Sequence, residues 1–447
     1  MNIGRRSALQ WLAGGVALAS LPRWARATEA ATDDYFIFVH ASGGWDVTLW
    51  SDPRNERKGL IEPASTDNTD TSSLLHWKPT KLDGDTDTFE ILAPSDSKLV
   101  FGPGIGALYD VRDRLTIING LAMNTVSHPD GTAYASTGRH LAGGRSPASS
   151  VDVAIANELG TGQLIPDVAV QFPSSYVGER LDRRAIPLRV SSAATMAKSL
   201  ARSPGFFTEA DRAEITAAVI ADAHELARRS TYPEPYERLA SQAQSMQSLL
   251  GSELEKVFTQ KALSDAYPQF DYKTKSVGQG ALGAAFAIEA MKRDVVRCVG
   301  ISLGGLDTHN TNYKQHAQTL QDVFGTIATL LHVLDTTPHP HRATAMLSHH
   351  THLYVFSDFC RTPQINIAGG RDHYPNNSAL IISPRFRGGR SFGATDPEQL
   401  LPADAKTFSD GKRAVAPPDV LATFLHAFGI DPTKYLRDGE VIPELLA

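Results

Sequence analysis

The sequence predicts an α/β fold, with a mainly parallel sheet and helices on both of its faces. Short apolar segments without helical period alternate along the chain with longer segments whose apolar residues recur at helical spacing. That alternation is typical of a parallel sheet covered on both sides. The composition, with 42% hydrophobic and 21% charged residues, is that of a globular protein, and 447 residues are enough to bury a large core.

The first predicted strand is the apolar segment 35–40, YFIFVH, which runs into a Gly-rich turn. Four more segments read as strands: 115–119, 295–303, 353–356 and 379–383. Four segments between and after them read as helices: one of small residues that ends near Gly138, then 281–292, 315–334 and 418–428. Strands and helices therefore alternate through most of the chain.

Two regions interrupt this alternation. Residues 51–95 are polar and rich in Asp, Thr and Pro, and we expect a long surface excursion there. Residues 203–263 read as a helical insertion of two helices, and Thr208 is a plausible N-cap of the first. The insertion is either structural packing or a lid.

The N-terminus has the layout of a twin-arginine signal peptide. Arg5 and Arg6 precede an apolar run from Ala8 to Leu21, and the small-residue pattern 25–27 follows. We expect residues 1–27 to engage the twin-arginine export machinery, so that residues 28–447 form a single exported domain, periplasmic where the cell has a periplasm. The alternative is a buried first helix with a chance arginine pair. The apolar run is too short to span a membrane, and no transmembrane span is expected in the mature chain.

Charge and cysteine content narrow the class of protein further. The formal net charge is −6, which argues against a nucleic-acid partner. The two cysteines, Cys298 and Cys360, cannot form a disulfide framework.

Acidic and histidine residues follow the ends of predicted strands. They are Asp46, His128, Asp307, His309, Asp358 and His373. An open α/β sheet gathers its ligand-binding groups beyond the carboxyl ends of its strands, so residues far apart in sequence can meet there. Asp and neutral His are common ligands of zinc, manganese and iron, and the pattern predicts a metal site.

Each of these residues also has a structural interpretation. Asp46 can cap a turn, Asp307 and His309 can form a capped turn with a surface histidine, and Asp358 can pair with Arg361. Asp372 either ligates the metal or orients the ring of His373. Five further histidines are interpreted as a solvated loop before a strand: His339, His341, His349, His350 and His352.

Four segments carry a family resemblance. They are GGWD (43–46), GGLDTHNTN (304–312), FSDFCRTPQINIAGGRDHYP (356–375) and DVLATFLHAFGID (419–431). In this order the chain resembles the alkaline phosphatase superfamily, which includes sulfatases and cofactor-independent phosphoglycerate mutases. It is more similar still to a family of twin-arginine-exported bacterial proteins of unknown function. The likeness covers most of the mature chain and implies an alkaline-phosphatase-like fold.

The resemblance implies roles for the candidate ligands. Asp307, His309 and His373 look like one metal site, and Asp46 and Asp358 look like another. The implied cofactor is a divalent metal, zinc, manganese, iron or calcium, with one or two ions bound.

The resemblance also locates a nucleophile position. Counting back from the Thr-Gly-Arg at 137–139 places His128 where the superfamily has Ser, Thr or Cys. His128 is then either a metal ligand or a phosphohistidine nucleophile, and Ser127 or Thr132 is the alternative nucleophile. Phe359 also departs from the pattern, because phosphatases commonly have a metal-binding His directly after the acid, so the second metal site is weak or absent.

The implied activity is metal-dependent hydrolysis of a small anionic phosphate or sulfate ester. Arg139 or Arg371 would steady the anion, with Arg361 as a further choice. The alternative is a non-catalytic exported protein for binding or assembly, which keeps the fold and one metal and has an exported partner protein.

Overall fold

The computed structural model describes residues 32–62, 73–82, 86–178, 180–192, 195, 208–237, 239–240, 243–244 and 254–447. By its internal contacts the chain divides into two units. One comprises Met1–Thr28 and Ala194–Ala262, and the other comprises Glu29–Ala193 and Leu263–Ala447. The second unit holds the central sheet and every candidate site residue. The signal peptide expected over residues 1–27 lies outside the described residues.

The core of the second unit is an eight-stranded sheet in the order β14-β4-β13-β10-β1-β7-β5-β6. Its strands are β1 (Tyr35–Ser42), β4 (Leu115–Asn119), β5 (Ile165–Val170), β6 (Leu188–Val190), β7 (Val296–Gly304), β10 (Thr351–Ser357), β13 (Ser378–Ile382) and β14 (Arg390–Phe392). Strands β6, β5, β7, β1 and β10 pair in parallel, and β14 pairs in parallel with β4. Strand β13 runs antiparallel to both of its neighbours. The mainly parallel sheet predicted from the sequence is confirmed.

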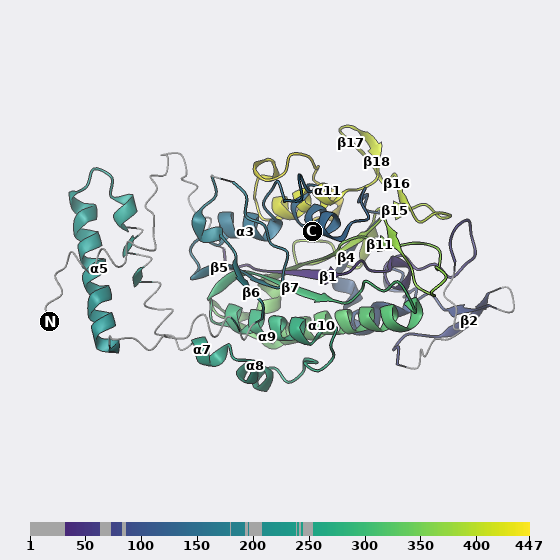
Figure 1. Cartoon of the computed structure of the whole chain (residues 1–447), viewed down its shortest axis with the longest axis horizontal. Helices are drawn as coiled ribbons and strands as arrows, with labels where there is room; N and C mark the ends of the chain where they lie inside the picture. The colour runs from purple at the N-terminus through teal and green to yellow at the C-terminus, as the bar shows by residue number, and fades with distance from the viewer. Residues whose placement is uncertain are drawn as a thin grey trace. The chain divides into compact units, whose positions relative to one another are not determined.

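Helices cover both faces of this sheet, as Figure 1 shows with the sheet seen nearly edge-on. Helices α9 and α10 lie along one face, and α3 and α11 lie on the other. The helices of this unit are α2 (His128–Thr137), α3 (Val151–Leu159), α9 (Gly278–Lys292), α10 (Ala317–Thr336) and α11 (Pro417–Ala427). The predicted covering of both faces is confirmed.

Strand β1 shows why these segments fold as buried strands. Its apolar run has no polar side because both faces are covered. Phe36 and Phe38 point to one face, where their rings lie 6.4 and 6.1 Å from the ring of Phe424 in α11. Ile37 and Val39 are fully buried as well. Strand β1, which lies between β7 and β10, therefore contributes buried side chains to the core.

Short elements surround the sheet. The small hairpins pair β2 (Pro79–Leu82) with β3 (Thr86–Phe89), β8 (Pro338–His339) with β9 (Arg342–Met346), β11 (Cys360–Arg361) with β12 (His373–Tyr374), β15 (Ala394–Thr395) with β16 (Pro402–Ala403), and β17 (Lys406–Phe408) with β18 (Gly411–Arg413). The short helical turns are η1 (Val47–Leu49), η2 (Pro103–Arg114), η3 (Arg183–Ala185), η4 (Asn312–His316), η5 (Leu347–His350), η6 (Pro432–Lys434) and η7 (Pro443–Leu445). The hairpin β2–β3 lies in the polar segment 51–95, of which residues 63–72 and 83–85 are outside the described residues.

The predicted helical insertion falls largely on the first unit. Helix α5 (Glu209–Arg229) begins after Thr208, whose side chain forms a capping box with Asp211, as the sequence predicted for its N-cap. Helices α7 (Leu254–Val257) and α8 (Gln260–Ala266) follow, and half of the second predicted helix lies outside the described residues. Among the described residues, no helix is both long and apolar enough to cross a membrane.

The prediction that the histidine-rich segment is a solvated loop is wrong for two of its members. His352 lies inside β10 and is 1% exposed, and His339 lies in β8 and is 4% exposed. His352 is buried because its Nδ1 and Nε2 face the Ser383 hydroxyl and the Asp34 carboxylate at 2.7 and 3.5 Å. Its Nδ1 thus has a hydrogen-bond partner inside the protein, and its Nε2 has only the more distant carboxylate.

Candidate metal centre

The topology brings the candidate residues to one edge of the sheet. Asp46 follows β1, His128 follows β4, Asp307 and His309 follow β7, and Asp358 follows β10. Because β13 runs the opposite way, His373 reaches the same edge from the segment before it. The sheet therefore gathers these side chains as its carboxyl edge predicts.

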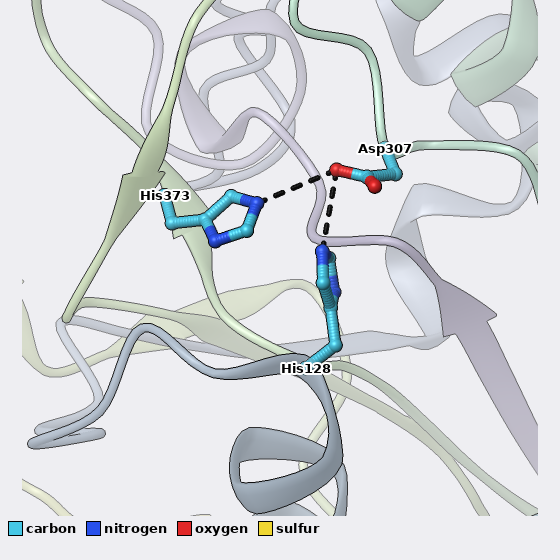
Figure 2. A group of neighbouring side chains, drawn as sticks. All are labelled: His128, Asp307 and His373. Atoms are coloured by element: carbon cyan, nitrogen blue, oxygen red, sulfur yellow. Dashed lines mark hydrogen bonds and ion pairs between the residues drawn. The ribbon is translucent and has the colours of Figure 1, made fainter.

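Three histidines surround one carboxylate oxygen. Asp307 Oδ1 lies 3.2 Å from His128 Nε2, 3.0 Å from His309 Nε2 and 3.4 Å from His373 Nε2. The Nε2 atoms of His309 and His373 are 3.1 Å apart. Figure 2 shows His128 at the start of a helix and His373 on a separate segment, with both rings directed at the Asp307 carboxylate.

These separations match those between the ligands of a small metal ion. A tetrahedral site with bonds of about 2.0–2.1 Å has ligand atoms roughly 3.3 Å apart. The ligand atoms of His128, Asp307 and His373 lie within 4.8 Å of one another. In addition, His128 Nε2 is buried and has no hydrogen-bond partner in the described part of the chain. The arrangement fits a divalent ion held by three imidazoles and one carboxylate.

The other ring nitrogen of each histidine is held by an acceptor. The Nδ1 contacts are His128 to Asp358 at 2.7 Å, His309 to Asp372 at 2.7 Å, and His373 to the Val126 carbonyl at 2.8 Å. A carboxylate or carbonyl can only accept, so each Nδ1 carries a proton, and in the neutral ring that ligates a metal each Nε2 presents a lone pair. Three lone pairs directed at one small region repel each other unless a cation lies between them.

Asp372 therefore has a different partner from the one expected. The sequence suggested that it ligates the metal or orients the ring of His373, but its hydrogen bond goes to His309. Asn366 supports this contact by donating to Asp372 at 3.1 Å and to the His309 carbonyl at 3.0 Å.

Arg361 holds Asp307 in place. This fully buried guanidinium donates to Asp307 Oδ1 at 2.8 Å, to the Leu306 carbonyl at 2.9 Å and to the Gly44 carbonyl at 2.8 Å. Burial acts to raise the pKa of Asp307, but the Arg361 hydrogen bond and the charge of His128 outweigh it and lower the pKa to about 2. Asp307 is thus a carboxylate, ready to ligate, at any physiological pH.

Close backbone approach fixes the loops that carry these ligands. Gly43 has φ +108°, and a side chain there would lie 2.4 Å from the backbone nitrogen of Asp307. Likewise, a side chain at Gly370 would lie 2.0 Å from the backbone of His309. Only glycine allows the loops to meet at these two points.

Asp358 lies beside the centre but is fully occupied by protein donors. Its two oxygens face His40 Nε2 at 2.5 Å, Thr132 Oγ1 at 2.8 Å, the Gly43 amide at 3.0 Å and His128 Nδ1 at 2.7 Å. An ionised carboxylate has about four acceptor positions, and these contacts fill them. Burial raises the pKa of Asp358, but the His40 charge and the hydrogen bonds more than offset this and lower it. Asp358 thus orients His128, and its predicted pairing is with histidines rather than with Arg361.

Asp46 is occupied in the same way at a second place. It is completely buried, and its oxygens face the Thr48 amide and hydroxyl at 3.0 and 2.7 Å, Asn312 Nδ2 at 2.7 Å and Arg371 Nε at 3.3 Å. Arg371 is also fully buried and donates to the carbonyls of Thr362 and Glu62, both at 2.7 Å. The geometry gives Asp46 and Asp358 separate sets of partners, and a second ion between them stays a prediction.

The other predicted residues occupy different parts of α2. Ser127 is its N-cap, exposed and without a side-chain capping bond, directly before His128. Thr132 donates to Asp358 one turn further on. Arg139 follows Gly138 at the far end of this ten-residue helix, about 15 Å from its start. Of these, Ser127 and Thr132 lie next to the centre, and the anion-binding roles of Arg139 and Arg371 stay predictions.

Sequence reasoning missed several partners in the centre. His40 is the last residue of the predicted strand YFIFVH, and a histidine ending an apolar strand at the carboxyl edge was a usable signal. His316, whose Nε2 accepts from the Asp46 amide at 2.7 Å, lies in a turn of π-helix that no local pattern announces.

A family model described as "Protein of unknown function (DUF1501)" matches residues 35–440. No curated protein matches the sequence. A putative sulfatase from Bacteroides thetaiotaomicron VPI-5482 is similar with a TM-score of 0.33 and 9% identity, over 93% of this chain and 75% of that one.

Two further solved structures show the same degree of likeness. The alkaline phosphatase from the Antarctic bacterium TAB5 gives a TM-score of 0.30 and 11% identity, over 79% of this chain and 92% of that one. The phosphonate monoester hydrolase of Agrobacterium radiobacter gives a TM-score of 0.32 and 11% identity, over 92% and 77% of the two chains.

Proposed function

We propose a function for this chain, which belongs to the DUF1501 family of proteins of unknown function. The membership is shown because the family model matches residues 35–440. We infer that it is a metal-dependent hydrolase of phosphate or sulfate esters, with one divalent ion held by His128, Asp307, His309 and His373. The observation that carries this proposal is the convergence of three Nε2 atoms within 3.0–3.4 Å of Asp307 Oδ1.

The saturation of the neighbouring carboxylates argues for one ion rather than two. The contacts of Asp358 fill its acceptor positions, and Asp46 accepts three hydrogen bonds and forms an ion pair with Arg371. Arg371 supplies a positive charge next to Asp46, where a second metal would otherwise balance it.

When bound, a divalent ion polarises an ester oxygen and lowers the pKa of a bound water. The chain supplies the surroundings. Asp358 keeps the proton of His128 on Nδ1, and Arg361 holds the Asp307 carboxylate. The side chains of Asp307 and His309 are 50% and 45% exposed, so the centre is open to an ester from the solvent on that side.

Two nucleophiles suit this geometry, an activated water and the Ser127 hydroxyl. We expect His128→Ala and Asp307→Ala to abolish turnover together with metal binding. Ser127→Ala separates the alternatives: loss of turnover with metal retained assigns the nucleophile to Ser127, and retained turnover assigns it to water.

A non-catalytic role in binding or assembly is the second candidate. It is favoured by the arginines: the guanidinium groups of Arg361 and Arg371 donate to protein carbonyls and carboxylates, and both side chains are fully buried. Neither is placed to receive an anion from solvent. This candidate predicts a stoichiometric metal in a protein that turns over no ester and has an exported partner protein.

The deciding experiment measures metal by mass spectrometry on mature protein purified without chelator. We expect about one equivalent of zinc, manganese, iron or calcium in the wild type and a large loss in Asp307→Ala. Asp110→Ala changes an exposed aspartate in η2 that is not a candidate ligand. It is the matched control and should keep the metal. Turnover of 4-nitrophenyl phosphate or sulfate then distinguishes the enzyme from the binding protein, and folded protein without metal refutes both.

We further propose export by the twin-arginine pathway, because Arg5 and Arg6 precede an apolar run and a small-residue cleavage pattern. Changing both arginines to lysine should block processing and leave the chain in the cytoplasm. Processing unaffected by that change would refute the proposal.

A further inference from the structure

A pocket of 430 Å³ lies beside the metal centre and shares His128 and Asp358 with it. Its wall also includes His40 at the end of β1, residues of α2, and the segment that follows β5. The pocket is thus beyond the carboxyl ends of parallel strands, where α/β folds bind ligands, and its volume is in the usual range of about 300–1,000 Å³. Asp307, His309 and His373 are not part of its wall.

Hydroxyl groups dominate the polar part of this wall. They belong to Thr132, Ser136, Thr137, Ser146, Ser174 and Ser175. Most of their protons are already committed to protein acceptors. The donations are Thr132 to Asp358 at 2.8 Å, Ser136 to the Thr132 carbonyl at 2.8 Å, Thr137 to the Ala133 carbonyl at 2.7 Å, and Ser146 and Ser175 to the Ala148 carbonyl at 2.8 and 3.1 Å. What these oxygens have left to offer a ligand is acceptor lone pairs.

The charged groups of the wall also favour a ligand that donates hydrogen bonds. No lysine or arginine lines the pocket in the described part of the chain, and its two imidazoles, His40 and His128, already contact the carboxylate of Asp358. A phosphate, sulfate or carboxylate has only acceptors to offer and would lose its water without gaining donors there. The wall therefore rejects an anion and favours a group that brings its own hydrogen-bond donors.

Most of the accessible surface of the wall is apolar. Pro129, Ala133 and Pro173 lie among the hydroxyl-bearing residues. A group with C–H faces and several hydroxyls matches both kinds of surface, whereas a wholly apolar group would give the remaining acceptor lone pairs no donor.

We propose that this pocket binds the uncharged, polyhydroxylated organic part of the substrate, while the anionic ester group lies at the metal centre. The ester part of this inference rests on the proposed function; binding of a polyol in the pocket does not. The organic part of the substrate would then meet hydrogen-bond acceptors in the pocket. Its anionic ester group would meet the metal ion at the centre.

The test measures the binding of three matched probes to metal-loaded mature protein by ligand-observed NMR. The probes are methyl glucoside as the neutral polyol, glucuronate as its anionic counterpart and cyclohexanol as its apolar counterpart. We expect methyl glucoside to bind at least tenfold more tightly than the other two. Equal binding of all three, tighter binding of glucuronate, or no binding of any probe overturns the proposal.

Variants from two elements place the bound probe. Ala133→Leu in α2 and Ser146→Leu in the loop after it both reduce the pocket volume, and each should weaken methyl glucoside binding at least tenfold. Ser409→Leu, at an exposed serine in the turn between β17 and β18, is the matched control and should leave binding unchanged. If both pocket variants bind the probe as the wild type does, the site is elsewhere and the proposal fails.

Asp307→Ala separates this inference from the proposed function. It removes a metal ligand outside the pocket wall, so methyl glucoside binding should persist within about twofold while metal is lost. Persistent polyol binding without any ester turnover in the wild type would refute the hydrolase and leave the pocket assignment standing. Turnover of an ester without polyol binding would refute the pocket assignment alone.

Discussion

Replacing Asp372 by alanine tests the tautomer argument on which the metal centre depends. The Asp372 carboxylate accepts from His309 Nδ1 at 2.7 Å, and this keeps the Nε2 lone pair of His309 directed at the centre. Loss of such an orienting partner typically weakens metal binding about 10–100-fold, or roughly 1.4–2.7 kcal/mol. The Asp372 side chain is 54% exposed, so water can take over part of its role, and we expect about a tenfold loss.

The assay is a competition titration of metal against a chromophoric chelator, run on folded protein at neutral pH. Asp372→Asn is the matched control, because its amide oxygen still accepts from Nδ1, and it should lose less than about threefold. His309→Ala sets the scale by removing the ligand itself. If His309→Ala weakens binding strongly and Asp372→Ala does not, the Nδ1 contact has no orienting role; if neither weakens it, His309 is not a ligand.

Three further outcomes follow from the described contacts. Asp46→Ala leaves the buried Arg371 guanidinium without its carboxylate, so chemical denaturation should show a loss of about 3–5 kcal/mol in unfolding free energy. Asp335→Ala, at an exposed aspartate paired with Arg114, should lose about 1 kcal/mol or less. Gly43→Ala places a side chain 2.4 Å from the next loop at φ +108°, so metal content and thermal midpoint should both fall. Burial and the nearby Asp152 raise the pKa of Asp167 well above its usual range, so the folded state keeps a proton that the unfolded chain releases. Stability should therefore decrease as pH rises from the ordinary aspartate pKa of about 3.9 toward that raised value, and Asp167→Asn should flatten the urea midpoint across the same range.

The sequence was informative about the sheet where strands are uniformly apolar. Strands β1, β4, β7, β10 and β13 coincide with predicted segments to within a few residues, because burial on both faces demands continuous apolar runs. Strand β5 went unpredicted since Asp167 interrupts its apolar run, IPDVAV. A buried acid is tolerated at that point because burial and Asp152 of α3 raise its pKa and keep it protonated, and the neighbourhood of a strand and a helix is not visible in local sequence.

The sequence also indicated which residues would lie at the carboxyl edge, but not how they would pair. Strand ends are local features, and position beyond a strand end follows from parallel topology. Pairing depends on loop paths: the close approach at Gly43 brings the loop after β1 against the one after β7. It also depends on long side chains such as Arg371, which crosses from its own loop to Asp46. Neither is determined by residue type or spacing.

The ring of His128, at the start of α2, is not arranged as a nucleophile. A nucleophile at this position needs one reactive atom facing the substrate and free of the protein. The imidazole of His128 instead has Nδ1 on the Asp358 carboxylate at 2.7 Å and Nε2 buried 3.2 Å from Asp307 Oδ1. Both of its nitrogens are therefore turned toward the protein's own carboxylates, an arrangement suited to a ligand and unsuited to attack on an ester. If the protein is a hydrolase, its nucleophile must come from Ser127 or from water, and His128 serves as a third nitrogen ligand for the metal.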